Sequence, residues 1–205
     1  MKNFFLLYIA LSSIFASCDK RIDCSQTDYS FEGFFKAYPD RDSIRIGDTI
    51  WLETKIPVVS KDVISGEMIN YTGAINLSTA IAFYELIPGP GDPAPLDAAN
   101  FFNYVLKKGL ARPSVDINYV REFRFVEEAG FYLFKLAIIP IKRGLFAIYP
   151  GDAANVYTKS NKCGKSFFSL TFRETNQHVY LYEQNRPGYT PSLYERQHMY
   201  AFKVY

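Results

Sequence analysis

Apolar and polar residues alternate with a period close to two along most of the chain after residue 25. In Arg121–Val126, charged residues alternate with apolar ones, as in a strand with one face in water and one face in a core. Phe131–Ile139 is apolar at both sets of alternate positions except at Lys135, which is typical of a central strand. These patterns predict nine strands: Tyr29–Ala37, Ser43–Ile46, Thr49–Lys55, Thr79–Ile87, Arg121–Val126, Phe131–Ile139, Leu145–Tyr149, Ser166–Arg173 and Met199–Tyr205.

Short turn sequences separate many of these segments, among them Tyr38-Pro39-Asp40, Ala129-Gly130 and Pro150-Gly151-Asp152. Consecutive strands joined by short turns pair antiparallel. The predicted fold class is therefore all-β, with residues 25–205 forming one antiparallel sandwich.

One segment, Asp97–Lys108, departs from the strand pattern. It begins with a suitable N-cap residue and ends with two lysines that are followed by Gly109. The stretch before it, Pro88–Pro95, is rich in proline and glycine and is expected to form a surface loop. The sequence thus predicts a loop and one short helix, inserted into the sandwich around residues 88–109.

Composition and charge narrow the class of protein. The chain has 205 residues, of which 48% are hydrophobic, and its 23 basic and 21 acidic residues give a net charge of +2. This balance excludes a disordered chain and does not provide the basic surface of a nucleic-acid binder. Three cysteines without a CxxC pair give no reason to expect a metal site, and no cofactor motif is present.

The N-terminus has the three parts of a secretory signal. A single lysine precedes the apolar run Phe4–Leu11, and small residues follow it up to Cys18. The apolar run is too short to cross a bilayer as a permanent helix. We expect residues 1–17 to be removed as a signal peptide.

The segment Phe15-Ala16-Ser17-Cys18 resembles the lipobox of bacterial lipoproteins, although the family prefers Leu where Phe15 stands. The resemblance implies that the Cys18 thiol receives a diacylglyceryl group and that the chain is cut just before it. Residues 18–24 would then form a lipidated tether that attaches the protein to a membrane. The alternative is an ordinary secretory signal that is cut nearby.

The strand pattern resembles the immunoglobulin-like sandwich domains of lipoproteins exported by Bacteroidota. The segments that carry this resemblance are Ser43–Leu52, Gly130–Leu136 and Tyr200–Val204. The chain departs from antibody-type domains, because its Cys, Trp and Cys residues do not have their spacing. The resemblance implies attachment to the outer membrane of the cell envelope, facing the periplasm or the exterior, and it implies no chemistry.

Cys24 and Cys163 remain if Cys18 carries lipid, and an exported protein is in a compartment that permits oxidation. We predict a disulfide between them, and the alternative is two unpaired buried thiols. A bridge would leave only residues 19–23 as a free tether, which reaches at most about 17 Å.

Candidate functional residues are few. No GxSxG elbow exists, and the two histidines, His178 and His198, fall in separate segments, so the sequence indicates no enzyme. Ser43 and Thr49 each follow an aspartate and precede an isoleucine, a pattern that resembles the O-glycosylation sites of exported Bacteroidota proteins. The alternative for both is ordinary turn chemistry at a strand edge.

Six of the sixteen tyrosines fall in the last 30 residues. Tyrosine suits a surface that binds glycan or protein, and Tyr180, Tyr182 and Tyr194 are the candidate ligand-binding residues. The alternative is that these tyrosines lie on strands with their rings against the body of the domain.

The leading functional hypothesis is a non-enzymatic, lipid-anchored protein of the cell envelope, which acts as a binding or assembly component. Its partners would be the membrane, through the N-terminal lipid, and a glycan or another envelope protein. One alternative is a structural subunit of a surface filament or complex, for which an exposed apolar sheet edge would be diagnostic. Another is a glycan-binding module that uses the tyrosine-rich C-terminal region.

Overall fold

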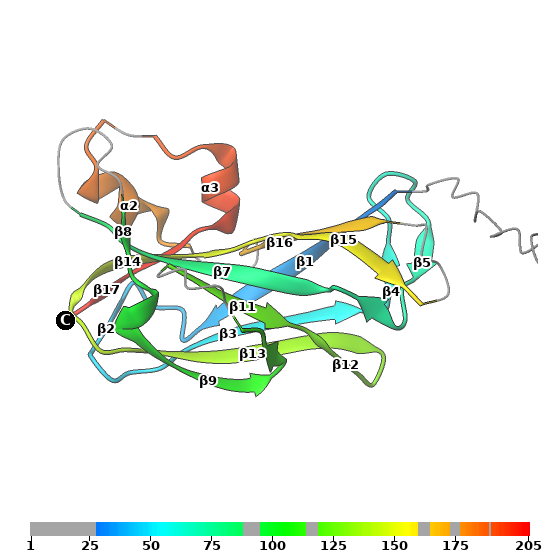
Figure 1. The fold of residues 1–205 in the computed structure, drawn as a ribbon. Helices are drawn as coiled ribbons and strands as arrows, with labels where there is room; N and C mark the ends of the chain where they lie inside the picture. The colour runs from blue at the N-terminus through cyan, green and yellow to red at the C-terminus, as the bar shows by residue number, and fades with distance from the viewer. Residues whose placement is uncertain (1–27, 88–94, 114–118, 160–164, 173–176, 189) are drawn as a thin grey trace, which may run out of the picture.

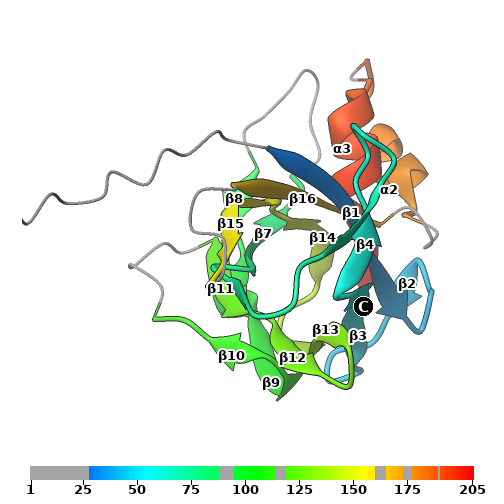
Figure 2. The same ribbon diagram turned by 90° about the vertical axis from the view of Figure 1, so that its right-hand side faces the viewer.

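The computed structural model describes residues 28–87, 95–113, 119–159, 165–172, 177–188 and 190–205. These residues fold mainly into strands, which form two curled sheets around one core (Figures 1 and 2). Two short helices lie against the sheets toward one end of the molecule (Figure 1). The all-β class predicted from the sequence is therefore confirmed.

The first sheet contains eight strands. In spatial order these are β12 (Val126–Glu128), β13 (Phe131–Pro140), β3 (Ile50–Pro57), β1 (Tyr29–Tyr38), β16 (Ser166–Thr171), β15 (Ala153–Thr158) and β6 (Ala74–Ile75). The eighth strand, β9 (Phe102–Lys108), pairs with the same edge of β13 as β12 does, but farther along β13. The strand β13 was predicted to be central, and it pairs with β3 along one edge and with β12 and β9 along the other.

The second sheet contains seven strands. They are β10 (Leu110–Ala111), β11 (Val120–Arg124), β7 (Ser78–Glu85), β14 (Gly144–Pro150), β17 (Tyr200–Val204) and β2 (Ser43–Ile44), with β8 (Leu96–Asp97) paired to β7. A separate hairpin is formed by β4 (Val59–Lys61) and β5 (Met68–Asn70). Each of the nine predicted segments contains a strand, so these predictions are confirmed.

The prediction that all strands pair antiparallel is wrong. The strand β1 runs parallel to β16, and β2 runs parallel to β17. Each of these pairs joins segments more than a hundred residues apart in the sequence, whereas the prediction considered only strands linked by short turns.

The predicted helix over Asp97–Lys108 is also wrong. This stretch forms β8, a 3-10 turn (Ala99–Phe101) and β9. Within β9, Phe102 is buried and the exposure alternates along the strand, which is the two-residue period of a sheet. The ring of Phe102 packs 5.0 Å from that of Phe146, so packing against the core and pairing with β13 override the local capping pattern.

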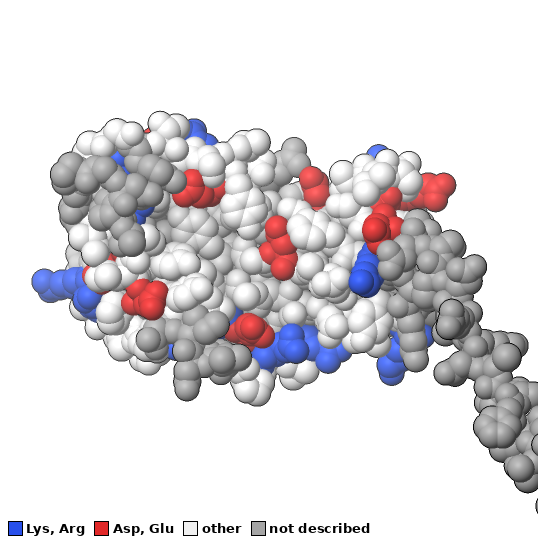
Figure 3. All heavy atoms as spheres, turned by 45° about the horizontal axis from the view of Figure 1, so that its top comes forward, with Lys and Arg blue, Asp and Glu red and all other residues white. Residues whose placement is uncertain are grey.

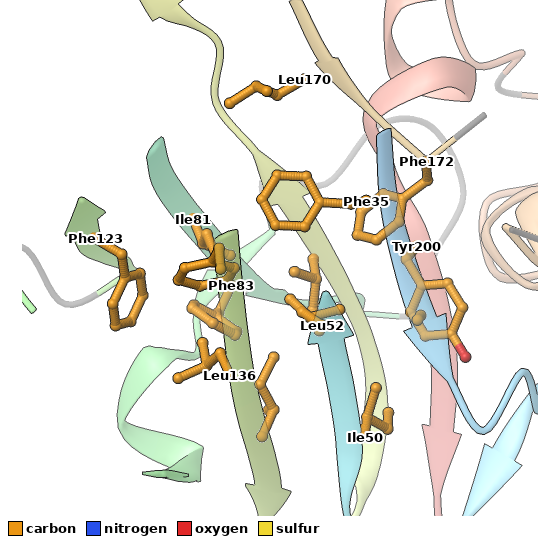
Figure 4. Packing of buried hydrophobic residues seen from close by; sticks show 14 of the residues in the cluster. Phe35, Ile50, Leu52, Ile81, Phe83, Phe123, Leu136, Leu170, Phe172 and Tyr200 are labelled. Carbon is orange, nitrogen blue, oxygen red and sulfur yellow. The ribbon is translucent and has the colours of Figure 1, made fainter. Parts of the chain in front are cut away.

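Aromatic and aliphatic side chains from both sheets fill the core. Figure 4 shows Phe35, Leu52 and Leu136 of the first sheet across from Ile81 and Phe83 of the second. All five side chains are fully buried. Alternate residues of a strand point to opposite faces. The residues that alternate with Phe35, Leu52 and Leu136 along their own strands therefore face away from the core.

The C-terminal region contains the helices α2 (Val179–Asn185) and α3 (Leu193–His198), and the sequence did not predict either of them. The interpretation that the tyrosines of this region lie on strands is therefore wrong for Tyr180, Tyr182 and Tyr194. A local signal for α3 does exist, because Ser192 and Glu195 form a reciprocal capping box.

Candidate functional site

The outer face of the first sheet carries a row of charged residues that crosses four strands. Lys36 of β1 is in register with Glu53 of β3, which is in register with Lys135 of β13. Lys108 of β9 follows on the far side of Lys135. Side chains at facing positions of neighbouring strands lie within contact distance of one another, so this register gathers three lysines around one glutamate.

Two carboxylates partly neutralise the row. The Nζ atom of Lys135 lies 2.5 Å from Oε1 of Glu53. Lys108 forms an ion pair with Glu128 of β12. The four side chains are between 39% and 55% exposed, so these pairs are accessible to water and to ligands. Exposed ion pairs of this kind stabilise a fold by about 0–1 kcal/mol each and exchange readily for other partners.

Lys135 and Lys108 face each other across the β9–β13 pair, where repulsion between their charges would destabilise the sheet. Like charges directly across a strand pair are destabilising. Here they lie at an irregularity in the β9–β13 register, between Lys135 and Leu136. Glu53 and Glu128 reduce this repulsion, because each of them pairs with one of the two lysines.

Aromatic rings border the lysines on the same face. The Nζ atom of Lys135 is 4.9 Å from the centre of the ring of Trp51, and Nζ of Lys55 is 3.7 Å from that of Phe131. Both distances are within the range of cation–π attraction. Trp51 is the only tryptophan of the chain, and it lies on the outer face rather than in the core. The rings thus hold two ammonium groups in place above the sheet.

The four lysines of this face and Glu53 line a groove of about 470 Å³, which we call the lysine groove. Its lining residues are Phe34, Lys36, Glu53, Thr54, Lys55, Lys108, Leu133, Phe134 and Lys135. The volume is that of sites that hold small molecules or a short stretch of a polymer. Four lysines against one glutamate make the groove suited to a ligand that carries several negative charges.

The surface around the groove includes a basic row. Figure 3 shows several Lys and Arg side chains in a row along the lower edge of the view, while Asp and Glu side chains and a few further Lys and Arg side chains are scattered over the rest of that face. A chain with a net charge of only +2 can therefore present a locally basic surface.

The candidate tyrosines do not gather on one surface. Tyr182 is buried, and its hydroxyl accepts a 2.7 Å hydrogen bond from Arg186, so it cannot serve as the surface residue that was predicted. Tyr180 is partly exposed and donates a hydrogen bond to Asp42. Tyr194 is exposed, and its ring stacks on that of His198 with 3.9 Å between centroids. The first two lie on α2 and the third on α3.

Both histidines are buried and contact aspartates. Nε2 of His198 lies 3.2 Å from Oδ1 of Asp152, and Nε2 of His178 lies 3.4 Å from Oδ1 of Asp40. Burial lowers the pKa of His198, but hydrogen bonds to Asp152 and to the Tyr194 carbonyl outweigh it and raise this pKa above its ordinary value. The two histidines remain separate from the lysine groove, and each has the contacts of a residue that joins segments of the fold.

The two residues predicted to be glycosylated lie near one turn. Ser43 is in β2, and Thr49 directly precedes β3. Both are partly buried, and the Ser43 hydroxyl donates a 2.9 Å hydrogen bond to Asp42. Cys18, Cys24 and Cys163 lie outside the described residues, as does the predicted signal peptide.

Within the described ranges, no group of three or more His, Cys, Asp or Glu side chains is arranged to hold a metal ion. No helix in that part of the chain is long and apolar enough to cross a membrane. The chain matches no family model, and a comparison with curated proteins finds no significant match.

Sequence reasoning missed the lysine groove. The alternation of Trp51, Glu53 and Lys55 with buried residues was a usable sign, because it marks one outer face. In the sequence, Lys135 stands out only as an exception in an apolar strand. The register of β13 with β3 and β9 sets it between Glu53 and Lys108.

Proposed function

We propose that the protein is a non-enzymatic, lipid-anchored component of the cell envelope that binds an anionic polymer, such as an acidic polysaccharide, in the lysine groove. The observation that carries this proposal is the row of Lys36, Glu53, Lys135 and Lys108 across four strands. Lysine ammonium groups act as point charges that bind sulfate, carboxylate or phosphate groups without a fixed geometry. The anionic groups of the polymer would replace Glu53 and Glu128 as ion-pair partners of the lysines.

The position of the groove on a rigid sheet supports binding of an extended ligand. Lys36, Glu53 and Lys135 belong to long strands whose buried faces are locked in the core. The side chains are thus held at fixed spacings before a ligand arrives, which reduces the entropy lost on binding.

The proposed location of the protein in the cell envelope rests on the sequence, where the resemblance to a lipobox implies lipid at Cys18. The predicted bridge between Cys24 and Cys163 has independent support in the fold. The amide of Tyr29 donates a 3.4 Å hydrogen bond to the carbonyl of Lys165, where β1 and β16 start side by side. Cys24 precedes Tyr29 by five positions, and Cys163 precedes Lys165 by two, so the bridge would join cysteines that are near in sequence to two residues lying side by side.

We further propose that the two sheets are a variant of the immunoglobulin-like sandwich. The antiparallel pairs in both sheets and the core between them support this assignment. The parallel pairs β1–β16 and β2–β17 are the departure from the pattern that the sequence predicted.

A filament subunit that assembles by adding strands at its edges receives less support. The strands β2, β6, β10 and β12 at the ends of the two sheets have only two or three residues. The longer edge strand β9 ends in Lys107 and Lys108. Short and charged edges are devices that prevent strand addition.

Binding to dextran sulfate and to uncharged dextran tests the function, because the two polymers share one backbone and differ in charge. We expect the mature domain to bind dextran sulfate, to bind it more weakly at higher salt, and to ignore dextran. Replacing Lys36 and Lys55 by Ser removes two contacts of about 0.5–1 kcal/mol each, so the affinity should fall about 5- to 30-fold.

The matched control removes two positive charges outside the groove, with Arg143→Ser and Lys203→Ser. Both of these residues are exposed, and Lys203 lies on β17 of the second sheet. The control variant should keep most of the affinity. Equal losses in the two variants, or no binding of dextran sulfate by the wild type, would contradict the proposal.

A further inference from the structure

The hairpin of β4 and β5 presents apolar side chains to solvent at its tip. Ile64 is 74% exposed and Val63 is 57% exposed, and both lie in the turn between the two strands. Met68, at the start of β5, is 63% exposed and is in register with Lys61. Neighbouring aliphatic side chains that are this exposed mark an interaction surface.

The turn is held in one conformation. The Asp62 carboxylate accepts 2.7 Å hydrogen bonds from the amides of Ser30 and Ser65. The amide of Gly66 donates to the carbonyl of Asp62, and the amide of Val63 donates to the carbonyl of Ser30. Val63 and Ile64 are therefore presented by a built turn, and their exposure is not a consequence of a loose loop.

The hairpin tip lies where the chain enters the domain. Its bonds to Ser30 attach it to the second residue of β1, and Figure 1 shows β4 and β5 at the end of the molecule where β1 starts. Ser30 follows Cys18 by twelve positions, a chain length that spans at most about 43 Å. A lipid on Cys18 would thus hold the start of β1, and the hairpin tip bonded to it, within about 43 Å of the bilayer surface.

We propose that Val63, Ile64 and Met68 of the hairpin insert into the interface of the bilayer to which the protein is anchored. This inference rests on the lipid anchor of the proposed function. The side chain of Lys61 passes within 4 Å of the position of a Cβ atom on Gly66, so a cation lies beside the apolar tip, and the exposed Glu67 places an anion there as well. The anchor supplies attachment, and the hairpin fixes which end of the domain faces the lipid.

A single tryptophan placed at the tip tests the insertion. In the full lipidated chain, combining Trp51→Phe with Ile64→Trp leaves position 64 as the only tryptophan. The matched control is Trp51→Phe with Leu193→Trp, because Leu193 is 72% exposed and belongs to α3, which lies away from the hairpin in Figure 1. Both variants are bound to vesicles of phosphatidylethanolamine and phosphatidylglycerol with brominated acyl chains. We expect strong quenching at position 64, with a blue shift, and little quenching at position 193.

Vesicle flotation of the same samples separates this inference from the anchor. Protein that floats with the vesicles but shows equal quenching at the two positions overturns the insertion and leaves the anchor intact. Protein that does not float overturns the anchor on which the inference rests. A concentration-dependent blue shift at position 64 without vesicles would identify the tip as a contact between copies of the chain, and that result also overturns the proposal.

Discussion

The carboxylate of Asp62 and the backbone amide of Ser30 lie 2.7 Å apart, and this hydrogen bond ties the start of β1 to the turn between β4 and β5. Asp62 is 1% exposed, although it is charged and lies in a surface hairpin. Backbone amides can satisfy a buried carboxylate in place of water, and here they come from both sides of the junction. The residue thus joins the entry of the chain, the hairpin and the sheet.

Asp62→Asn should destabilise the domain. The amide keeps one acceptor oxygen but turns an NH₂ group toward a backbone amide, so one charge-assisted hydrogen bond is lost. We expect the free energy of unfolding to fall by about 1.5–3 kcal/mol. Urea unfolding measures this change, and the exposed Asp28→Asn is the control, with an expected change within about 0.5 kcal/mol. Equal effects of the two substitutions would show that the junction contributes nothing.

Acid should remove the same contribution. Burial alone would raise the pKa of Asp62, but its hydrogen bonds with Ser30 and Ser65 lower this pKa from 3.8 to about 2. Because the folded state binds this proton more weakly, the stabilisation is complete above pH 3.8 and is lost as the pH falls toward 2. The difference in stability between the wild type and Asp62→Asn should shrink over this range. A constant difference would rule out this linkage.

The pair of His198 and Asp152 predicts the opposite pH dependence. The pKa of His198 is raised above 6.5, so the folded state holds the proton more tightly than the unfolded state does. Its contribution to stability is complete below pH 6.5 and is lost as the pH rises through the raised pKa. His198→Gln should lack this part of the pH dependence. Stability curves of the variant and the wild type that run parallel above pH 6.5 would contradict the prediction.

Thr54→Val should stabilise the domain. Thr54 is 5% exposed, and among the described residues its hydroxyl oxygen has no hydrogen-bond partner. Burial of an unsatisfied hydroxyl costs about 1–3 kcal/mol, and valine has nearly the same shape. We expect a gain of about 1 kcal/mol in thermal or urea unfolding, and no gain from the exposed Thr190→Val. A loss of stability would show that the hydroxyl is satisfied in solution.

The predicted bridge between Cys24 and Cys163 is tested by reduction. The bridge would enclose 138 residues and would constrain the unfolded chain by about 4–5 kcal/mol. We expect the unreduced protein to resist thiol alkylation at both positions, and a reducing agent to lower its stability. Complete alkylation of both cysteines without reduction would exclude the bridge.

The strands were predictable where the pattern of one segment decides its structure. Phe131–Ile139 and Tyr29–Ala37 were predicted as strands from their apolar and aromatic residues, and the structure has strands over Phe131–Pro140 and Tyr29–Tyr38. The stretch Asp97–Lys108 was predicted as a helix from its capping residues, but residues Phe102–Lys108 form the strand β9. Pairing with β13 decided the outcome, and such long-range pairing is not visible in a local pattern.

The candidate site was less predictable than the fold. The lysine groove depends on the register that aligns Lys36, Glu53 and Lys135 on separate strands, and a sequence does not state this register. The tyrosines were conspicuous in the sequence, yet Tyr182 became part of the interior because α2 turns it against the domain. The parallel pair of β1 and β16 was likewise hidden, since its partners are far apart along the chain.

The polymer proposed for the lysine groove and the proposed insertion of the hairpin both depend on the compartment that a lipid on Cys18 would fix. Mass spectrometry of the mature protein from the membrane fraction tests it most directly, together with fractionation of Cys18→Ala. We predict a mature chain that begins at Cys18 and carries diacylglyceryl, and a variant that leaves the membranes. A mature chain that begins elsewhere without fatty acid, or a variant that stays with the membranes, would contradict the anchor.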